Sequence, residues 1–246
     1  MRACVTRVAD TIRLYRLLGR LEAKVGGMRR LQECTGRMAW PRRGLYFFFE
    51  AGEMRSGSGE GRRVVRIGTH GLTEGSRSTL WGRLSQHRGT EGGGGNHRGS
   101  IFRLLVGVAL ARQGVMALPP SWGVGAGTGT AARRLNVDRA EVKAAEAELE
   151  LRVSRYVGEM PLLWLDVGDR PSPSSERGLI ESNAIALLSS SRGEAPDPAS
   201  TAWLGRFSDR ERVRGSGLWN NRHVDEPYCP SFLDVVERRV EDVPAA

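Results

Sequence analysis

Two side chains that can act on a phosphate group, Arg83 and His87, lie four residues apart in one short segment. In a helix, residues at this spacing share one face. A guanidinium binds phosphate oxygens and stabilises the negative charge that develops when they react. An imidazole transfers protons or holds a neighbouring base by a hydrogen bond. The pair is therefore a candidate for phosphodiester chemistry, and the alternative is a solvated basic face on a surface helix.

One carboxylate, Glu181, interrupts an apolar helical pattern far downstream of this pair. Ala184, Ile185 and Leu188 follow it at helical spacing and share its face. A carboxylate among apolar neighbours is costly unless a cation or a metal ion compensates its charge. Glu181 is therefore either half of a structural ion pair with an arginine or a ligand of a divalent metal.

Four more candidates lie in or beside expected strands and loops. Tyr46 belongs to an aromatic run, where it is either a core residue or, if nearby cations favour its ionised form, a general base. His70 follows a strand at a strand-to-loop junction, where functional residues are common. His97 and Arg98 lie in a glycine-rich tract and are candidates for contact with a substrate backbone.

Hydrophobic periodicity and chain breakers predict the elements that must position these residues. Strands are expected at 44–49, 64–67 and 162–167, and the first two should pair as an antiparallel hairpin with a long polar loop. Helices are expected at 6–25, 79–88 (capped by Ser78), 101–111, 139–157, 174–188 and 231–240, with a loop at 118–130. These elements predict an α+β fold with a small central antiparallel or mixed sheet of about three strands, flanked by helices.

The length of 246 residues suits one domain with embellishments. We expect a helical extension at 1–40, a catalytic domain with helical insertions at 41–190, and a tail at 191–246 that packs on the domain. No apolar run of about 18 residues exists, so no membrane-spanning helix is expected. Three cysteines without a Cys-x-x-Cys pair indicate neither a zinc site nor a disulfide framework, which fits a cytoplasmic protein.

The net charge of +9 favours a polyanionic partner, with nucleic acid as the first candidate. Only Lys24 and Lys143 among the basic residues are lysines. The arginine guanidinium binds phosphate through two parallel hydrogen bonds, which suits a nucleic-acid partner. Codon bias in a GC-rich genome would produce the same high arginine content. Charge therefore supports a polyanion partner without identifying it.

Taken together, residues 44–190 resemble the GIY-YIG nuclease superfamily. Its first motif, Gly-Ile-Tyr, is similar to Gly44-Leu45-Tyr46, and its second, Tyr-Ile-Gly, is similar to Arg66-Ile67-Gly68. The family's helix arginine falls on Arg83, the histidine that its restriction-enzyme branch adds falls on His87, and its metal-binding glutamate falls on Glu181. Arg66 in place of the second tyrosine, and the long segments between the motifs and before Glu181, depart from the family pattern.

The resemblance implies a metal-dependent endonuclease that hydrolyses DNA phosphodiester bonds. Glu181 would hold Mg²⁺ or Mn²⁺, Tyr46 would be the general base, His87 would hydrogen-bond Tyr46, Arg83 would neutralise the phosphate, and His70 would assist. The substrate-binding candidates are Arg66, His97, Arg98 and Asn220, and either Asn220 or Asn221 takes the place of the family's late asparagine. A homodimer is one arrangement that suits a duplex cutter. The alternatives are a catalytically degenerate DNA-binding module on the same scaffold and a protein–protein scaffold with incidental basicity.

Overall fold

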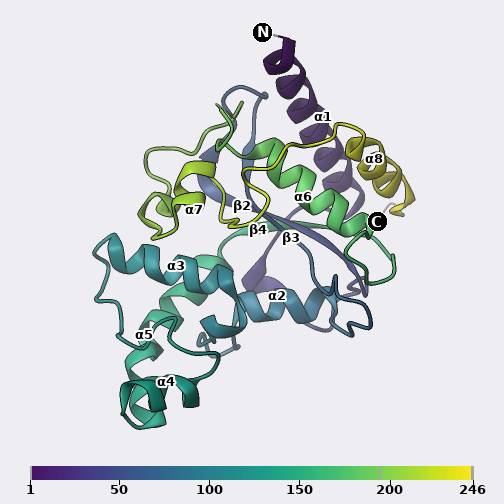
Figure 1. Cartoon of the computed structure of the whole chain (residues 1–246). Helices are drawn as coiled ribbons and strands as arrows, with labels where there is room; N and C mark the ends of the chain where they lie inside the picture. Colours follow the sequence, from purple (N-terminus) through teal and green to yellow (C-terminus); the bar gives the residue numbers. More distant parts are fainter. Residues whose placement is uncertain (1, 194, 245–246) are drawn as a thin grey trace.

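The protein folds around one four-stranded sheet with helices on both faces (Figure 1). This computed structural model describes residues 2–193 and 195–244, and side chains from residue 6 onward. The strands are β1 (Arg29–Arg30), β2 (Gly44–Met54), β3 (Arg62–Gly68) and β4 (Pro161–Asp166). The α-helices are α1 (Arg2–Lys24), α2 (Leu80–Arg88), α3 (Ile101–Arg112), α4 (Thr128–Leu135), α5 (Arg139–Gly158), α6 (Glu176–Leu188), α7 (Glu211–Ser216) and α8 (Phe232–Asp242). Three short 3₁₀ turns lie at Leu31–Glu33, His97–Gly99 and Leu204–Phe207.

The strand order is β1-β4-β2-β3, and all pairs are antiparallel. The α+β class and the expected hairpin of β2 and β3 are confirmed. The sheet has four strands rather than three, because a two-residue strand such as β1 is too short to leave a pattern in the sequence. In the hairpin, Tyr46 lies opposite Gly68 and Phe48 lies opposite Arg66.

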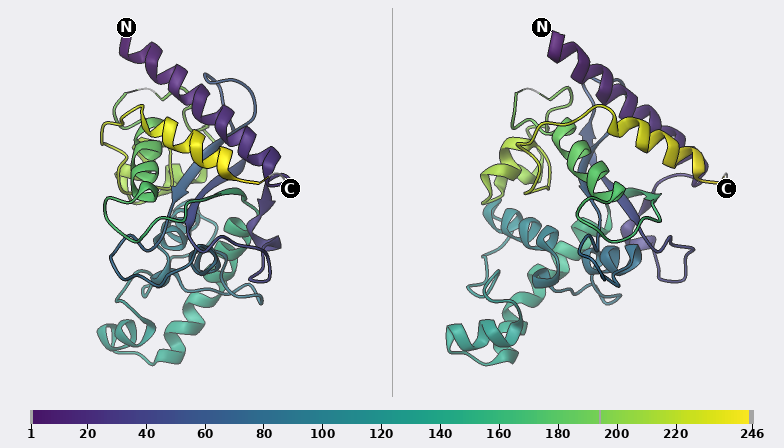
Figure 2. Two further views of the ribbon diagram at one scale, coloured as in Figure 1. Left: turned by 90° about the vertical axis from the view of Figure 1, so that its right-hand side faces the viewer. Right: turned by 45° about the vertical axis from the view of Figure 1, so that its right-hand side comes forward.

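Successive residues of a strand point to opposite sides of the sheet. Both faces of this sheet are buried, because helices cover each of them. Leu45, Phe47 and Phe49 of β2 enter one core, whereas Tyr46 and Phe48 enter the other. Helices α1, α6 and α8 cover the first core, and α2, α3 and α5 cover the second (Figures 1 and 2). Tyr46 consequently lies on the face that α2 covers, where His87 is found.

The outer edge of β3 is closed by a segment from the tail. The backbone N–H of Trp219 donates to the carbonyl of Val65 at 2.8 Å. The side-chain amide of Asn220 bonds both backbone groups of Ile67, accepting from its N–H at 3.1 Å and donating to its carbonyl at 2.7 Å. These bonds satisfy an edge that would otherwise expose free donors and acceptors. They also bring the tail to the end of β3 where the functional candidates gather.

Two glycines of the hairpin leave room for close neighbours. A Cβ on Gly44 would lie 2.3 Å from the carbonyl oxygen of Leu165 on β4. A Cβ on Gly68 would lie 2.2 Å from the hydroxyl oxygen of Tyr46, whose ring is buried. The phenol of Tyr46 therefore lies across the bare backbone of Gly68.

Gly68→Ala is expected to lower the free energy of unfolding by about 1–3 kcal/mol, the usual cost of overpacking a tight core. Urea denaturation followed by circular dichroism measures this change. Gly168→Ala is the matched control, because a Cβ there meets nothing within 4 Å. Equal stability of the two variants would show that the Tyr46 ring yields without cost.

Several predicted boundaries were wrong. Thr79 rather than Ser78 caps α2, with its hydroxyl accepting from the Gly82 N–H at 3.0 Å. Strand β2 runs on to Met54, into the expected polar loop, and α1 begins by Arg2. Helix α4 was missed, because Gly125, Gly127 and Gly129 indicate a loop.

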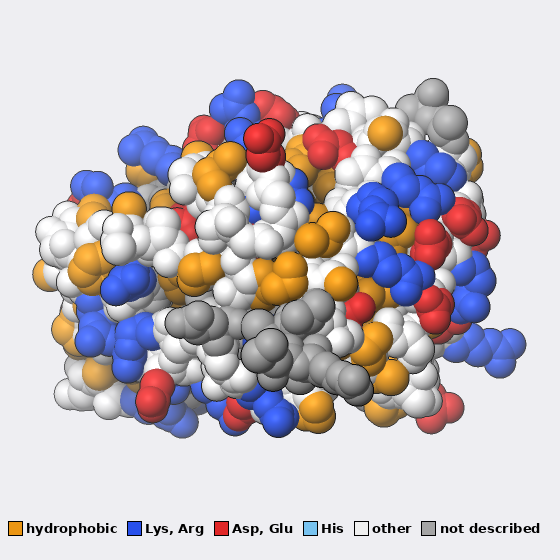
Figure 3. Space-filling view, turned by 90° about the horizontal axis from the view of Figure 1, so that it is seen from above, with side chains coloured by type: hydrophobic (Ala, Val, Ile, Leu, Met, Phe, Trp, Pro, Cys, Tyr) orange, Lys and Arg blue, Asp and Glu red, His pale blue; other side chains and the backbone are white. Residues whose placement is uncertain are grey.

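On the face seen from above, Lys and Arg side chains are scattered with Asp and Glu among them, and no single patch of one charge stands out there (Figure 3). Among the residues that the structure describes, no helix combines the length and the apolar character needed to cross a membrane. The functional site must therefore be located from geometry rather than from net charge.

Candidate active site

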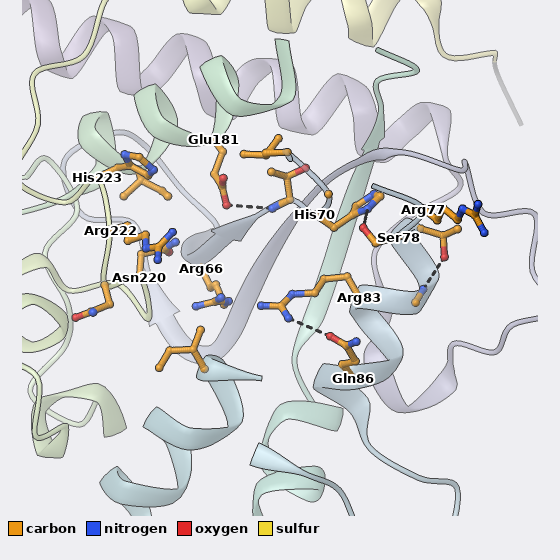
Figure 4. A pocket seen from close by; sticks show the side chains of 18 residues that line it. Arg66, His70, Arg77, Ser78, Arg83, Gln86, Glu181, Asn220, Arg222 and His223 are labelled. Atoms are coloured by element: carbon orange, nitrogen blue, oxygen red, sulfur yellow. Dashed lines mark hydrogen bonds between the residues drawn. The ribbon is translucent and has the colours of Figure 1, made fainter. Parts of the chain in front are cut away.

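A pocket of about 880 Å³ opens where β3 ends, between α2 and α6, with the tail segment as its third wall (Figure 4). The side chains that line it are mostly cationic or polar and include Arg66, His70, Arg77, Ser78, Arg83, Gln86, Glu181, Asn220, Asn221, Arg222 and His223. Glu181 is the one carboxylate among its described lining residues. Four arginines around one glutamate give the pocket a net positive charge that suits a phosphate-bearing substrate.

Glu181 projects from α6 toward the end of β3. One carboxylate oxygen accepts a hydrogen bond from the Thr69 N–H at 3.1 Å, and the Thr69 hydroxyl donates to the Gly44 carbonyl at 2.8 Å. No ion pair to Glu181 exists in the described part of the chain, so the structure offers no support for the structural ion pair. Burial raises the pKa of Glu181, against the opposing effects of the Thr69 hydrogen bond and of Arg66. The carboxylate therefore carries an electrostatic cost that a bound cation would relieve.

Arg66 and Arg83 converge on the pocket from β3 and from α2 (Figure 4). Arg66 is buried, stacks at 4.6 Å on Phe102 and donates to the Trp219 carbonyl at 2.5 Å, while its Nε has no partner. Arg83 is held through one terminal nitrogen by the Gln86 side chain at 3.0 Å and the Gly99 carbonyl at 3.2 Å. Burial lowers the pKa of Arg66, and the charge of Arg83 acts in the same direction. An anion between the two guanidiniums would relieve their repulsion.

The hydroxyl of Tyr46 lies 2.8 Å from Nε2 of His87, and Nδ1 of His87 lies 2.7 Å from the Ser100 hydroxyl. All three residues are buried. Burial, with Arg66 and Arg83 nearby, holds the pKa of His87 well below its ordinary value, so its ring is neutral. A neutral ring can accept the Tyr46 proton at Nε2 and donate from Nδ1 to Ser100. The predicted bond between His87 and the phenol is thus present in the structure.

Tyr46 itself does not line the pocket. The guanidinium of Arg66 lies between the two, since it interacts with the Tyr46 phenol and also lines the pocket. The residue that replaces the second motif tyrosine therefore sits at the boundary between the buried Tyr46–His87 pair and the open cavity.

His70 lines the pocket directly after β3. Its Nδ1 lies 2.9 Å from the Ser78 hydroxyl, while its buried Nε2 has no partner. Arg177 of α6 donates to the backbone carbonyl of His70 and fixes its position. Burial and the charge of Arg177 lower the pKa of His70 to about 4, so the ring is neutral at pH 7. A neutral imidazole with a free nitrogen can accept a proton or hold a water molecule.

The structure does not bring His97 and Arg98 to the pocket. His97 is buried, stacks on Trp122 at 3.8 Å and lies 2.9 Å from Glu150. Arg98 forms two 2.7 Å hydrogen bonds with Glu146 of α5 and also donates to the carbonyls of loop 121–124. Both side chains are occupied by internal partners and anchor α5 to the body, so they are not retained in the site. Their glycine-rich tract has the composition of a loop, which concealed this packing.

Asn220 lines the pocket, but its side-chain amide is hydrogen-bonded to the backbone of Ile67 on β3, as described above. It is a positioning residue for the strand that carries Arg66. Ser100 was not among the predicted site residues, although a serine before an expected helix is a capping signal, and Ser100 does accept from the Arg103 N–H. Arg77, Arg222 and His223 also line the pocket without having been predicted, because no local pattern distinguishes them from other basic residues.

The sheet, the basic pocket and the Tyr–His pair define a nuclease-type domain. The chain belongs to the GIY-YIG family: the model of the GIY-YIG domain matches residues 5–246. No curated protein and no solved structure matches the chain closely enough to be reported as a relative. Family membership makes a nuclease with a nucleic-acid substrate the general class, and such nucleases generally depend on a divalent metal.

The donor set in the pocket fits a magnesium-like ion. No group of three or more His, Cys, Asp or Glu side chains that could enclose a metal exists among the described residues. Mg²⁺ does not require one, because it keeps several waters and commonly binds through one or two carboxylates together with substrate phosphates. Apart from the bond from Thr69, no hydrogen bond from the described chain reaches Glu181, which leaves an oxygen free for a cation.

Proposed function

We propose that this protein is a metal-dependent endonuclease that hydrolyses phosphodiester bonds of DNA. The observation that carries the proposal is the pocket in which Glu181 faces Arg66 and Arg83, next to the buried pair of Tyr46 and His87. Anion binding, a metal ligand and a proton acceptor are the three components that phosphodiester hydrolysis needs, and they converge here from β2, β3, α2 and α6.

Glu181 would hold the Mg²⁺ or Mn²⁺ ion. When bound, such an ion acts as a Lewis acid that stabilises charge on the scissile phosphate and on the leaving oxygen. Arg83 and Arg66 neutralise the phosphate from the opposite wall, and the bonds of Arg83 to Gln86 and Gly99 keep its guanidinium oriented before the substrate arrives. Arg77 and Arg222 at the rim contact the flanking phosphates.

Tyr46 serves as the proton acceptor for the attacking water, and His87 orients its hydroxyl and takes its proton. The neutral state of His87 makes this transfer feasible, because a protonated ring could only donate. The buried position of Tyr46 requires the Arg66 side chain to shift when the phosphate binds, which exposes the phenol to the pocket. His70, neutral with a free Nε2, holds the water on the far side.

The test is cleavage of supercoiled plasmid and of high-complexity genomic DNA, with Mg²⁺ or Mn²⁺ against EDTA. Nicked, linear or fragmented DNA is expected only with the metal. Genomic DNA is included because a specific recognition site can be absent from one plasmid. DNA binding without metal-dependent cleavage of either substrate would contradict the proposal and favour a catalytically degenerate binding module, for which Arg66 in the place of tyrosine is the specific observation.

Cleavage at limiting Mg²⁺ is expected to fall as the pH is lowered through the raised pKa of Glu181, at a pH above the ordinary carboxyl value of 4.5. The neutral acid cannot hold a cation, so protons and metal compete for this group. Raising the Mg²⁺ concentration should therefore move the midpoint of the profile to lower pH. If the midpoint pH does not change with the Mg²⁺ concentration, the pH dependence arises from a group other than Glu181.

A further inference from the structure

Helix α4 and the N-terminal half of α5 (residues 139–148) form an arm that projects away from the sheet, below α3 in Figure 1, whereas the C-terminal half of α5 packs in the core beneath the sheet. The arm has a small core of its own, built from Ala131 and Ala132 of α4, Val142 of α5 and the half-buried Val124. None of the side chains that line the catalytic pocket comes from it. The pocket chemistry therefore leaves the arm without a role.

The two helices are joined by a three-residue turn, because α4 ends at Leu135 and α5 begins at Arg139. Asn136 adopts the left-handed conformation, with φ 54° and ψ 47°, which asparagine tolerates better than most residues. The N–H of Val137 then donates back to the Ala132 carbonyl at 3.1 Å. A short helix, a tight left-handed turn and a second helix packed through small side chains are the parts of a helix-turn-helix unit.

Beside the arm core, α5 exposes cations and small side chains. Val142, Glu146 and Leu149 are buried, whereas Arg139 and Lys143, one turn apart, are exposed. Ala140, Ala144 and Ala147 are exposed beside them. Alanines allow a helix to approach another surface closely, and the two cations lie where the second helix of such a unit meets base edges and phosphates.

Charge on the arm is complementary to a polyanion on this face. Arg133, Arg134, Arg139 and Lys143 are exposed and form no ion pair among the described residues. Glu141 lies about 160° around α5 from Lys143, at 100° per residue, and so faces elsewhere. Glu148 is paired with Arg152, and Asp138 directly precedes Arg139 at the start of α5. In the described part of the chain, the four exposed cations of the arm therefore outnumber its two exposed acidic side chains without an ion pair, Asp138 and Glu141.

The arm is fixed rigidly to the nuclease body. Arg98 pairs with Glu146, and Arg103 of α3 pairs with Glu150 and also donates to the backbone carbonyl of His87 at 3.0 Å. Buried, hydrogen-bonded charge pairs of this kind hold two elements in one arrangement. The chain of contacts runs from α2, which carries Arg83 and His87, to the middle of α5. DNA held by the arm would therefore be held in a set position relative to the pocket.

We propose that the α4–α5 arm binds the major groove of duplex DNA, with Arg139 and Lys143 as the residues that read base edges and neighbouring phosphates. The proposal rests on the proposed function for the identity of the polyanion, and adds to it a site that selects sequence apart from the site that cuts. The projecting half of α5, about ten residues at about 1.5 Å each, is about 15 Å long and comparable with the width of the major groove, about 12 Å.

The test selects duplexes from a pool with a randomised central segment, in EDTA so that no cleavage occurs. The variants are Arg139→Ala with Lys143→Ala, and a control with the same charge change, Arg16→Ala with Arg37→Ala, at exposed positions outside α4 and α5. The wild-type protein is expected to enrich a common sequence. The arm variant should bind that selected duplex about 10–100-fold more weakly and lose its preference over the unselected pool, whereas the control variant keeps both.

The arm proposal is overturned if the arm variant selects the same sequence with wild-type affinity, or if the wild-type protein selects no sequence. An arm variant whose oligomeric state differs from that of the wild type, but whose DNA selection is unchanged, would overturn the proposal as well. In that case the exposed Leu135 and Val137 beside the arm turn would be part of a protein–protein contact. Metal-dependent cleavage is measured in parallel. Cleavage without sequence selection leaves the nuclease proposal standing, and selection without cleavage leaves only the arm proposal standing.

Discussion

Replacing Glu181 with glutamine is expected to reduce DNA cleavage by about three orders of magnitude while DNA binding persists. The amide keeps the shape of the side chain and its oxygen still accepts the Thr69 N–H, but it lacks the charge that holds a divalent cation. The measurement is the initial rate of plasmid nicking with Mg²⁺, together with duplex affinity in EDTA. Glu74→Gln, at an exposed position in the loop beside the pocket, is the matched control and should cleave normally.

The same substitution tests the metal without relying on activity. Burial raises the folded-state pKa of Glu181, so the ionised carboxylate costs stability at any pH above its unfolded value. In EDTA near pH 7.5 the Glu181→Gln protein should unfold at a higher temperature than the wild type. Added Mg²⁺ should raise the unfolding temperature of the wild type alone. Full cleavage by the variant, or equal stabilisation of both proteins by Mg²⁺, would show that Glu181 does not hold the metal.

Local patterns predicted the parts of the site that lie on regular elements. The aromatic run 44–49 and the segment 64–67 indicated a hairpin, and the hairpin register places Tyr46 opposite Gly68. The helical spacing of Arg83 and His87 placed both on α2. What the sequence does not encode locally is the pairing between distant segments. The bonds from Asn220 to Ile67 and from Ser100 to His87 depend on how the tail and α3 pack, and no periodic pattern in the sequence predicts them.

His97 and Arg98 show why composition alone misplaces a residue. Glycines at 92–95 indicate a flexible loop, yet their small size lets the buried Arg103 side chain approach this backbone, since a Cβ on Gly95 would lie 2.1 Å from its guanidinium. The acidic partners, Glu146 and Glu150, are spaced four apart on α5 and face inward. Two inward acids on one helix and a His-Arg pair in a distant loop are complementary, but only the tertiary fold shows that they meet.

Tyr46→Phe is expected to reduce cleavage by about 10²–10⁴-fold, the range for losing a general base. Only the hydroxyl that lies 2.8 Å from His87 is removed, and the ring that covers Gly68 remains. The loss leaves Nε2 of a buried histidine without a partner, which costs about 1–3 kcal/mol of stability. Cleavage rates and urea denaturation measure the two effects separately. Tyr156→Phe is the control, because the hydroxyl of this half-buried residue bonds Glu50 outside the pocket and its loss should leave the rate unchanged.

A double variant distinguishes a working pair from two independent residues. If His87 acts only through the Tyr46 hydroxyl, then Tyr46→Phe combined with His87→Ala should cleave no more slowly than Tyr46→Phe alone, because residues that act as a unit are not additive. Losses that multiply would mean that His87 contacts the substrate or the water itself. His87 is fully buried and does not line the pocket, and its Nε2 faces the Tyr46 hydroxyl. The buried position of His87 therefore predicts the non-additive result.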